Sequence, residues 1–369
     1  MRKNFISFRL TVIDRYIIRK FLGTFFYSIG LLIIIVVVFD VSEIIDDFLT
    51  RRAPLRAIIF DYYLNFIPYF INLFSSLFTF IAVIFFTSRL AERSEIIAML
   101  SSGINFFRLL KPYLISATFL VILTLYFSNF LIPHTNIKLR DFEKQYIKNP
   151  LRSKSLNLHL QIEPGVFVYF ESWDNARKNG YRFTIERIEN SKLSYKLMSD
   201  QIKWDSIKSK WHIINYTERF IDTATFEQSL VFGSQKDTTL NLRPTEIIVD
   251  KEDMKIMNFN ELKAFIEREK LKGSSTIKYY ETEMHKRIAE PISAIILTLI
   301  GMALSSRKVR GGTGMHLGIG IGITFTYILF MQITTQFSVY GNMAPMLATW
   351  LPNIFFGIIA IWLLLKAPK

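Results

Sequence analysis

The residues best placed for chemistry in this chain are two carboxylates and an arginine in a short polar tract. Glu92, Arg93 and Glu95 lie within Arg89–Gly103, between two hydrophobic stretches. Ionised side chains of this kind make charge-assisted hydrogen bonds with groups of opposite charge. Two interpretations are open. Either water solvates all three side chains, or the tract docks in a groove of a cytoplasmic motor protein, where Glu95 would meet an arginine.

Helical periodicity predicts that this tract is a short amphipathic helix over about residues 89–103. At 100° per residue, three apolar side chains share one side of the helix, and both carboxylates share the other. The apolar side holds Ile96, Ile97 and Leu100, and the other side holds Glu92, Glu95 and Met99. Such a helix either packs its apolar side on membrane helices or also carries force to them.

A second group of charged residues lies at the predicted outer ends of hydrophobic stretches. Lys and Arg usually gather in short cytoplasmic loops, so basic residues on the opposite side are candidates for binding anionic lipid head groups. Interfacial anchoring is the alternative. The candidates are Arg51, Arg52, Arg56, Lys138, Arg140, Lys286 and Arg287. Glu290 is expected to pair with Lys286 or Arg287, and His316 is expected to be interfacial rather than a proton relay.

Glycines recur at helical spacing in two of the hydrophobic stretches. Gly314, Gly318 and Gly322 are one turn apart in the fifth stretch, and Gly23 and Gly30 lie in the first. Small residues at this spacing let two helices approach closely in lipid. The glycines either pack within the chain or form a seam against a second subunit, and that seam would open as a gate.

Several kinds of chemistry find no support in the sequence. It contains no GxxxxGK[ST] phosphate-binding loop, so an ATPase activity would have to reside in another protein. Five scattered histidines and no cysteine provide no cluster of metal ligands. The hydrophobic stretches lack the series of carboxylates that proton-coupled carriers use. We therefore expect no bound cofactor, no metal site and no catalytic residue.

Six uncharged hydrophobic stretches position these residues. Each is long enough, or nearly so, to cross a hydrocarbon core of about 30 Å as a helix of about 20 residues. Half of the residues are hydrophobic, 34 are Phe, and the net charge is +14. The stretches are Phe21–Phe39, Tyr62–Ser88, Pro112–Pro133, Pro291–Ser306, Met315–Phe337 and Met346–Leu365. The sequence predicts a polytopic α-helical membrane protein with six transmembrane helices in a 3+3 arrangement around an insert.

The charges between the stretches orient the chain in the membrane. The N-terminal segment and the loops after the second and fourth stretches are basic, whereas the first loop is acidic and the fifth is uncharged. By the positive-inside rule, both termini are cytoplasmic and the insert lies outside. Because the chain has no cysteine, the insert must be held by its own core rather than by disulfides.

The insert alternates apolar and polar residues with the period of a β-strand, most clearly at Tyr181–Glu186 and Leu193–Leu197. Further predicted strands are Val166–Phe170, Gln201–Trp204, Trp211–Tyr216, Thr225–Phe232 and Thr238–Leu242. Many short strands at this spacing predict an all-β sandwich or jelly-roll-like domain. Asn258 is expected to cap a helix from about Phe259 to Lys272, which Gly273 ends. The predicted domains are 1–137, 138–272 and 273–369.

Four tracts resemble the lipopolysaccharide-transport permeases LptF and LptG. They are Ile13–Ile17, Arg93–Gly103, Met257–Leu262 and Glu283–Pro291. The order of three spans, a strand-rich domain and three spans is also similar to that family. The Asp14-Arg15-Tyr16 start and the ending from Tyr340 to Lys366 resemble LptG more than LptF.

The resemblance implies a subunit of a transporter in the bacterial inner membrane, not an enzyme. Its task would be to extract lipopolysaccharide and pass it towards a periplasmic bridge. The implied partners are an LptF-like paralogue, a cytoplasmic LptB-like ATPase dimer that uses ATP, a single-span LptC-like protein and an LptA-like bridge. No nucleic acid is implied. The resemblance implies that the loop after the second span inserts into the ATPase, with Glu95 as the matching acidic residue. It also implies that spans one and five line the gate. It also predicts that Glu95→Lys abolishes transport while the protein still folds.

One departure from the family pattern concerns the first span. Family members often carry a basic residue near its outer end, where this chain has the apolar Val36–Phe39 followed by Asp40.

Two other functions remain open from the residues alone. The chain could belong to another lipid or lipoprotein exporter, or it could be a membrane-anchored receptor or scaffold with a periplasmic β-domain.

Overall fold

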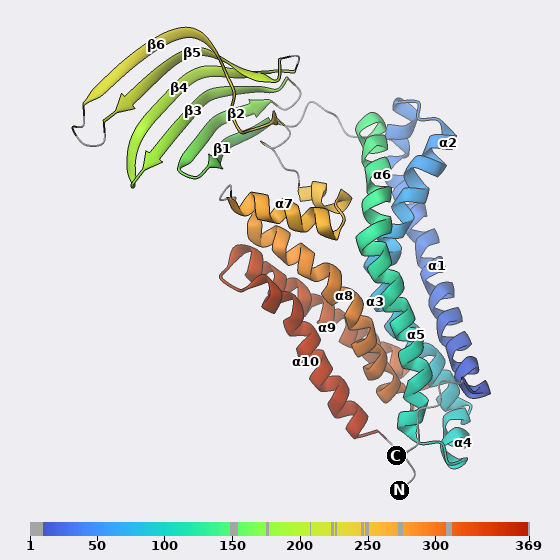
Figure 1. The fold of residues 1–369 in the computed structure, drawn as a ribbon. Coiled ribbons are helices and arrows are strands. Elements are labelled where there is room, and N and C mark those ends of the chain that lie inside the picture. The colour runs from blue at the N-terminus through green and yellow to red at the C-terminus, as the bar shows by residue number, and fades with distance from the viewer. Residues whose placement is uncertain are drawn as a thin grey trace. The chain divides into compact units, whose positions relative to one another are not determined.

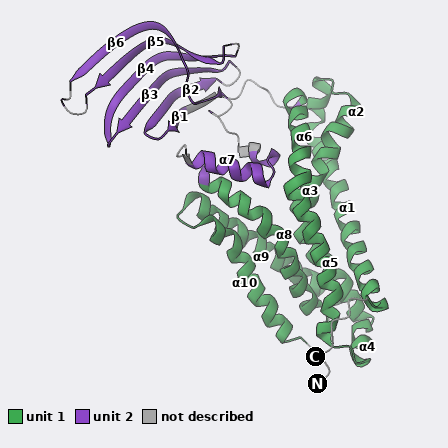
Figure 2. Cartoon of the chain, in the orientation of Figure 1, with its two compact units in different colours: residues 1–146, 278–369 green, residues 147–277 purple. Residues whose placement is uncertain are grey.

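The computed structural model describes residues 10–147, 154–174, 177–206, 208–222, 225, 227–244, 247, 251–271, 276–307 and 312–367. The chain divides into two compact units, residues 1–146 with 278–369 and residues 147–277 (Figure 2). The boundary expected after residue 137 falls inside a helix that continues to Tyr146. The expected residue Gly273 lies outside the described residues.

The first unit contains six helices long and apolar enough to span a membrane, three before and three after the insert (Figure 1). This confirms the 3+3 prediction. The elements of the first half are α1 (Val12–Thr50), α2 (Leu55–Ala57), η1 (Ile58–Tyr63), α3 (Leu64–Glu92), α4 (Glu95–Ser101), α5 (Phe106–Tyr126), η2 (Phe127–Leu131) and α6 (Ile132–Tyr146). Those of the second half are α8 (Ile277–Ser305), α9 (Gly312–Tyr340) and α10 (Pro345–Leu365).

The first helices are longer than the hydrophobic stretches that predicted them. With 39 residues, α1 reaches about 58 Å at a rise of 1.5 Å per residue. That is about twice the thickness of a hydrocarbon core of about 30 Å. Polar side chains cap the N-terminal ends of α1 and α5. At α1, the Thr11 hydroxyl accepts a hydrogen bond from the Asp14 amide, and the Asp14 carboxylate accepts one from the Thr11 amide. At the start of α5, the Asn105 side chain accepts one hydrogen bond from the Phe107 amide.

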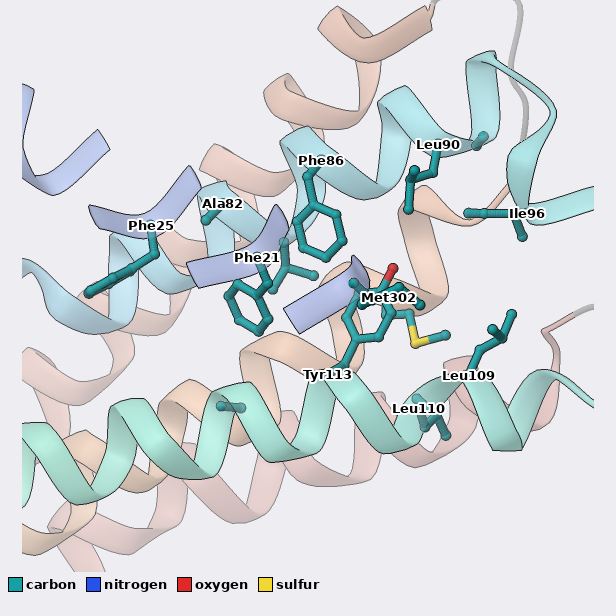
Figure 3. Close-up of a cluster of buried hydrophobic side chains, with 14 of the residues drawn as sticks. Phe21, Phe25, Ala82, Phe86, Leu90, Ile96, Leu109, Leu110, Tyr113 and Met302 are labelled. Carbon is teal, nitrogen blue, oxygen red and sulfur yellow. The ribbon is translucent and has the colours of Figure 1, made fainter. Parts of the chain in front are cut away.

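Helix α3 joins the two halves of the first unit because it contributes to two buried clusters. In one cluster, Phe86 of α3 stacks on Phe21 of α1 and on Tyr113 of α5, with ring centroids 5.5 and 5.2 Å apart (Figure 3). In the other, Phe80 and Ile84 pack with residues of α8, α9 and α10. A movement of α3 therefore changes the packing of both halves.

The second unit contains a six-stranded antiparallel sheet. Its strands are β1 (Lys154–Glu163), β2 (Val166–Asp174), β3 (Asn179–Glu189), β4 (Lys192–Asp205), β5 (Lys210–Ile221) and β6 (Gln228–Thr238). The strands pair in chain order, so the described sheet is a meander without the crossovers of a jelly roll. The all-β prediction is confirmed, but the two strands expected at residues 193–197 and 201–204 form one strand, and β1 was not predicted.

The core of the sheet lies on one face and includes Phe170, Trp173, Phe183 and Trp211, all fully buried. The indole Nε1 of Trp211 donates to the Leu242 carbonyl oxygen at 2.8 Å. This contact explains why the strand expected over Thr238–Leu242 is absent: the chain leaves the sheet edge after residue 238 and covers the core instead.

The helix expected after the strands is confirmed as α7 (Phe259–Leu271), preceded by the 3-10 helix η5 (Lys251–Ile256). Asn258 caps α7, since its Oδ1 accepts from the Glu261 amide at 3.0 Å. The Glu261 carboxylate accepts from the Asn258 amide at 2.9 Å. The apolar face of α7, which holds Leu262, Phe265 and Ile266, is buried as predicted.

Candidate functional site

The polar tract forms a corner between two helices rather than one helix. Helix α3 continues to Glu92, the chain turns at Ser94, and α4 begins at Glu95. Ser94 has a φ of 58°, in the left-handed region, which interrupts the helical hydrogen-bond series. The corner lies at the end of the first unit where α1 begins and α10 ends (Figure 1).

The buried side of α4 differs from the predicted one by one position. Ile96 is buried in the cluster that contains Leu90 and Phe106, and Met99 and Leu100 pack against that cluster. Ile97 was expected to be buried but is 52% exposed. The prediction assumed one continuous helix over residues 89–103, whereas α4 starts anew after Ser94 and packing against α3 and α5 decides its orientation. The apolar side chain of Ile97 therefore remains exposed.

Glu92 makes its contacts inside the chain. Its Oε1 atom accepts hydrogen bonds from the Thr313 amide nitrogen at 2.6 Å and from the Thr313 hydroxyl at 2.7 Å. Thr313 lies in the first turn of α9, whose amides have no helical acceptors. Glu92 thus caps α9 although 221 residues separate it from Thr313.

Glu95 contacts α1 instead of α9. Its Oε2 atom accepts a hydrogen bond from the Tyr16 hydroxyl of α1 at 3.0 Å, in an exposed position. Arg89 and Arg93 line the same small pocket of about 120 Å³ as Tyr16 and Glu95. Arg93 is exposed. The two carboxylates of the tract therefore bind two different membrane helices, α1 and α9.

Two further polar contacts near this corner were not predicted from the sequence. Asp14 of α1, whose side chain is 1% exposed, accepts two hydrogen bonds from Arg108 of α5 at 2.7 and 2.8 Å. His316 was expected to be interfacial, but it is buried, and its Nδ1 lies 2.9 Å from the Ser88 hydroxyl of α3. Tertiary structure brings these residues together, so local periodicity carries no signal for either pair.

The five predicted glycines are open to the surroundings of the chain. No atom lies within 4 Å of an added Cβ at Gly23, Gly30, Gly314, Gly318 or Gly322. Between the membrane helices, close packing involves Gly301, which lies against Phe80 and Val83, and Gly320, which lies against Ile84. Gly23 borders a groove of about 830 Å³ between α1, α3 and α9, which Arg19, Lys20 and Arg89 also line.

Of the seven basic head-group candidates, five lie in the turn after α1, on α2 and on α6. Arg52, Arg56 and Lys138 are exposed, and Arg51 and Arg140 are half-buried. An aromatic cluster joins these elements: Phe48 lies 5.6 Å from Tyr62 and 5.8 Å from Phe142, measured between ring centroids. These five basic residues thus occur on elements that pack together.

The remaining two candidates are on α8. Lys286 pairs with Glu290 at 3.2 Å, which confirms one of the two expected partners. Both line a cavity of about 260 Å³ together with residues of α3 and α9, among them Asn72 and Gln332. Arg287 is buried, with 8% exposure, so a head group cannot reach it in this arrangement.

Comparison with known proteins gives a consistent result. The family described as "Lipopolysaccharide export system permease LptF/LptG" matches residues 15–366. The permease LptG of Escherichia coli K12 is 23% identical over 282 residues, which cover 75% of this chain and 77% of that protein. The LptG of Haemophilus influenzae is 23% identical over 382 residues, which cover 96% of this chain and 98% of that protein. The matched region includes the α3–α4 corner and all three helices of the second half.

Proposed function

This chain belongs to the lipopolysaccharide export permease family LptF/LptG, as a multi-pass transporter component without a catalytic role, and we propose that it is the LptG-like subunit of the exporter. It forms one wall of a conduit that extracts lipopolysaccharide from the inner membrane, and a separate ATPase supplies the energy. The observation that carries this proposal is the α3–α4 corner, in which Glu95 and Arg93 line a small pocket and Ile97 remains exposed, an arrangement suited to a motor protein.

The energetics explain why a motor is needed. Moving acyl chains out of a membrane costs about 0.8 kcal/mol per methylene. A lipid with several acyl chains therefore does not leave the bilayer unaided. Because the sequence has no phosphate-binding loop, the energy has to come from ATP bound to an LptB-like dimer and reach this chain by contact.

The proposed orientation follows the charges. The basic start of the chain, the α3–α4 corner and the loop between α8 and α9 face the cytoplasm, and the sheet unit lies in the periplasm. At the cytoplasmic face, an arginine of the ATPase would replace the Tyr16 hydroxyl on Glu95, since a guanidinium adds the attraction of opposite charges to its hydrogen bonds with the carboxylate, which a neutral hydroxyl does not. Tyr16 holds the carboxylate in place until then.

The proposed partner in the membrane is an LptF-like paralogue. The open glycines of α1 and α9 support a seam there, because no described residue of this chain packs against the positions that their Cβ atoms would take. An LptC-like single-span protein and an LptA-like periplasmic bridge complete the proposed path. Lipid phosphates would meet exposed basic residues, of which Arg52, Arg56 and Lys138 are the most accessible.

Co-expression of the chain with its paralogue and the ATPase tests this proposal. We expect a stable complex whose ATP hydrolysis changes when lipopolysaccharide is added. The matched control is Glu95→Lys, which should insert in the membrane and pair with the paralogue but leave the ATPase unbound. If the wild-type chain purifies with no nucleotide-binding protein at all, the receptor or scaffold function replaces the transporter function.

A further inference from the structure

The contact between Glu92 and α9 suggests a role that differs from that of Glu95. The Glu92 carboxylate oxygen accepts two hydrogen bonds from one residue, Thr313, through the backbone amide and the side chain. Both bonds are short, at 2.6 and 2.7 Å, and both end on the same oxygen. The two bonds use both lone pairs of this oxygen atom, so the chain itself holds the Glu92 carboxylate at the start of α9.

A second link lies deeper on the same pair of helices. Ser88 is one turn before Glu92 on α3, and His316 is one turn after Thr313 on α9. The Ser88 hydroxyl and His316 Nδ1 are 2.9 Å apart in a buried position. Closer to the middle of both helices, Phe80 and Ile84 of α3 pack with Tyr327 and Met331 of α9. The two helices are therefore connected by polar contacts at the cytoplasmic end and by apolar contacts towards the middle.

The backbone at the start of α9 is adapted to this contact. Gly312 has a φ of 60°, a conformation that favours glycine, and an added Cβ would lie 2.9 Å from Glu92 Oε1. A side chain at this position would press on the carboxylate that caps the helix. The glycine therefore lets the first turn of α9 approach the end of α3.

We propose that Glu92 is a positioning residue that locks the first turn of α9 to the cytoplasmic end of α3, so that α9 follows α3 when the corner moves. This inference rests on the proposed function, because it assumes that a motor displaces the corner. Glu95 is then the exchangeable contact, which passes from Tyr16 to the motor, and Glu92 is the contact that stays. Together they convert one displacement of the corner into a movement of α9 relative to α1.

Hydrogen exchange of the whole chain in lipid nanodiscs tests the lock without any partner protein. Removing a helix cap costs about 1 kcal/mol, so Glu92→Ala should speed exchange at the first turn of α9 roughly fivefold. Glu92→Gln keeps an oxygen acceptor and should leave exchange close to the wild-type rate. Unchanged exchange in Glu92→Ala would overturn the proposal. Equal acceleration in Glu92→Ala and Glu92→Gln would also overturn it, because the proposal attributes the effect to the hydrogen bonds and not to the charge.

A distance measurement adds a readout that simple loss of stability would not move. The chain has no cysteine, so spin labels attach only at introduced sites such as Arg89→Cys on α3 and Met315→Cys on α9, both exposed. We expect a narrow distance distribution in the wild type and in Glu92→Gln, and a broader one in Glu92→Ala. A distribution in Glu92→Ala as narrow as that of the wild type would contradict the lock.

The assembled transporter separates this inference from the function on which it depends. Glu92→Ala should still bind the ATPase but transport at least severalfold less lipid per ATP hydrolysed, and Glu92→Gln should restore this ratio. If Glu92→Ala transports normally, the lock is not used in coupling even though the transporter function stands. If the wild type binds no ATPase, the proposed function fails, while the exchange experiment still reports on the contact itself.

Discussion

Arg108 of α5 donates two parallel hydrogen bonds to the carboxylate of Asp14 in the first turn of α1, at 2.7 and 2.8 Å. Asp14 also accepts a hydrogen bond from the Thr11 amide, so the same carboxylate caps the N-terminus of α1 and binds it to α5. The carboxylate is buried, whereas the Arg108 side chain is 39% exposed. This pair holds the start of α1, and with it Tyr16, next to the α3–α4 corner.

Arg108→Ala should destabilise the chain because it leaves a buried carboxylate without its partner. Loss of one member of a buried pair costs about 3–5 kcal/mol, but the exposure of Arg108 lets water screen the charge. We therefore expect about 1–3 kcal/mol, seen as a lower midpoint of thermal unfolding in detergent. Arg108→Lys, which keeps the charge but loses the two-pronged geometry, should cost less. Equal midpoints for Arg108→Ala and the wild type would show that the pair is not stabilising.

Glu95→Lys should abolish transport while the chain still folds and inserts. The lysine repels the arginine that we expect in the ATPase, and the side chain at this position is only half-buried, so the chain tolerates the change. Export of newly made lipopolysaccharide to the outer membrane measures the effect. Tyr16→Phe is the matched control: it removes only the intramolecular hydrogen bond at 3.0 Å and should still transport. Normal export by Glu95→Lys would remove the coupling role of this residue.

Two glycines on α9 should respond differently to the same substitution. Gly320→Val places a side chain against Ile84 and should cost about 1–3 kcal/mol through overpacking. A Cβ at Gly318 meets none of the residues that the structure describes, so with Gly318→Val the isolated subunit should be nearly as stable as the wild type. Helix propensity changes equally at both sites, and the comparison therefore isolates packing.

Pairing with the paralogue gives the second half of this experiment. Because Gly318 is proposed to lie in the seam, Gly318→Val should reduce recovery of the paralogue in co-purification. Full recovery would place the seam elsewhere.

The sheet unit should lose stability in acid through Glu218. Burial opposes ionisation of this side chain, but hydrogen bonds from Lys236 and Tyr195, at 2.6 and 2.7 Å, outweigh it and lower its pKa below the ordinary 4.5. Since the pKa is lower in the folded state, the contribution is complete above about pH 4.5 and is lost as pH falls through the folded value. Glu218→Gln should remove this dependence.

Tryptophan fluorescence can follow this transition in a background that carries Trp350→Phe and Trp362→Phe, which leaves the emission of the sheet. We expect acid unfolding of the wild-type sheet to be steeper with pH than that of Glu218→Gln. Identical pH profiles for the two proteins would assign the acid sensitivity to other groups.

Much of the architecture could be predicted because it depends on local patterns. A stretch such as Met315–Phe337 excludes charge over the length of a helix, and no backbone other than a helix satisfies its hydrogen bonds in lipid. The alternation at Tyr181–Glu186 requires an extended strand for the same local reason. The cap at Asn258 and the apolar face of α7 were also predictable, because residues three and four apart in sequence decide them.

The tertiary structure decided what the carboxylates contact. Glu92 and Glu95 look equivalent in the sequence, yet one binds α9 and the other α1, since a single left-handed residue at Ser94 separates their helices. The burial of Ile96 rather than Ile97, the pairing of Asp14 with Arg108, and the packing at Gly320 rather than Gly318 were likewise not predictable. Hydrophobic length and periodicity are properties of neighbouring residues, whereas these contacts join residues as far apart as Glu92 and Thr313, which 221 positions separate, and only the packed helix bundle places them together.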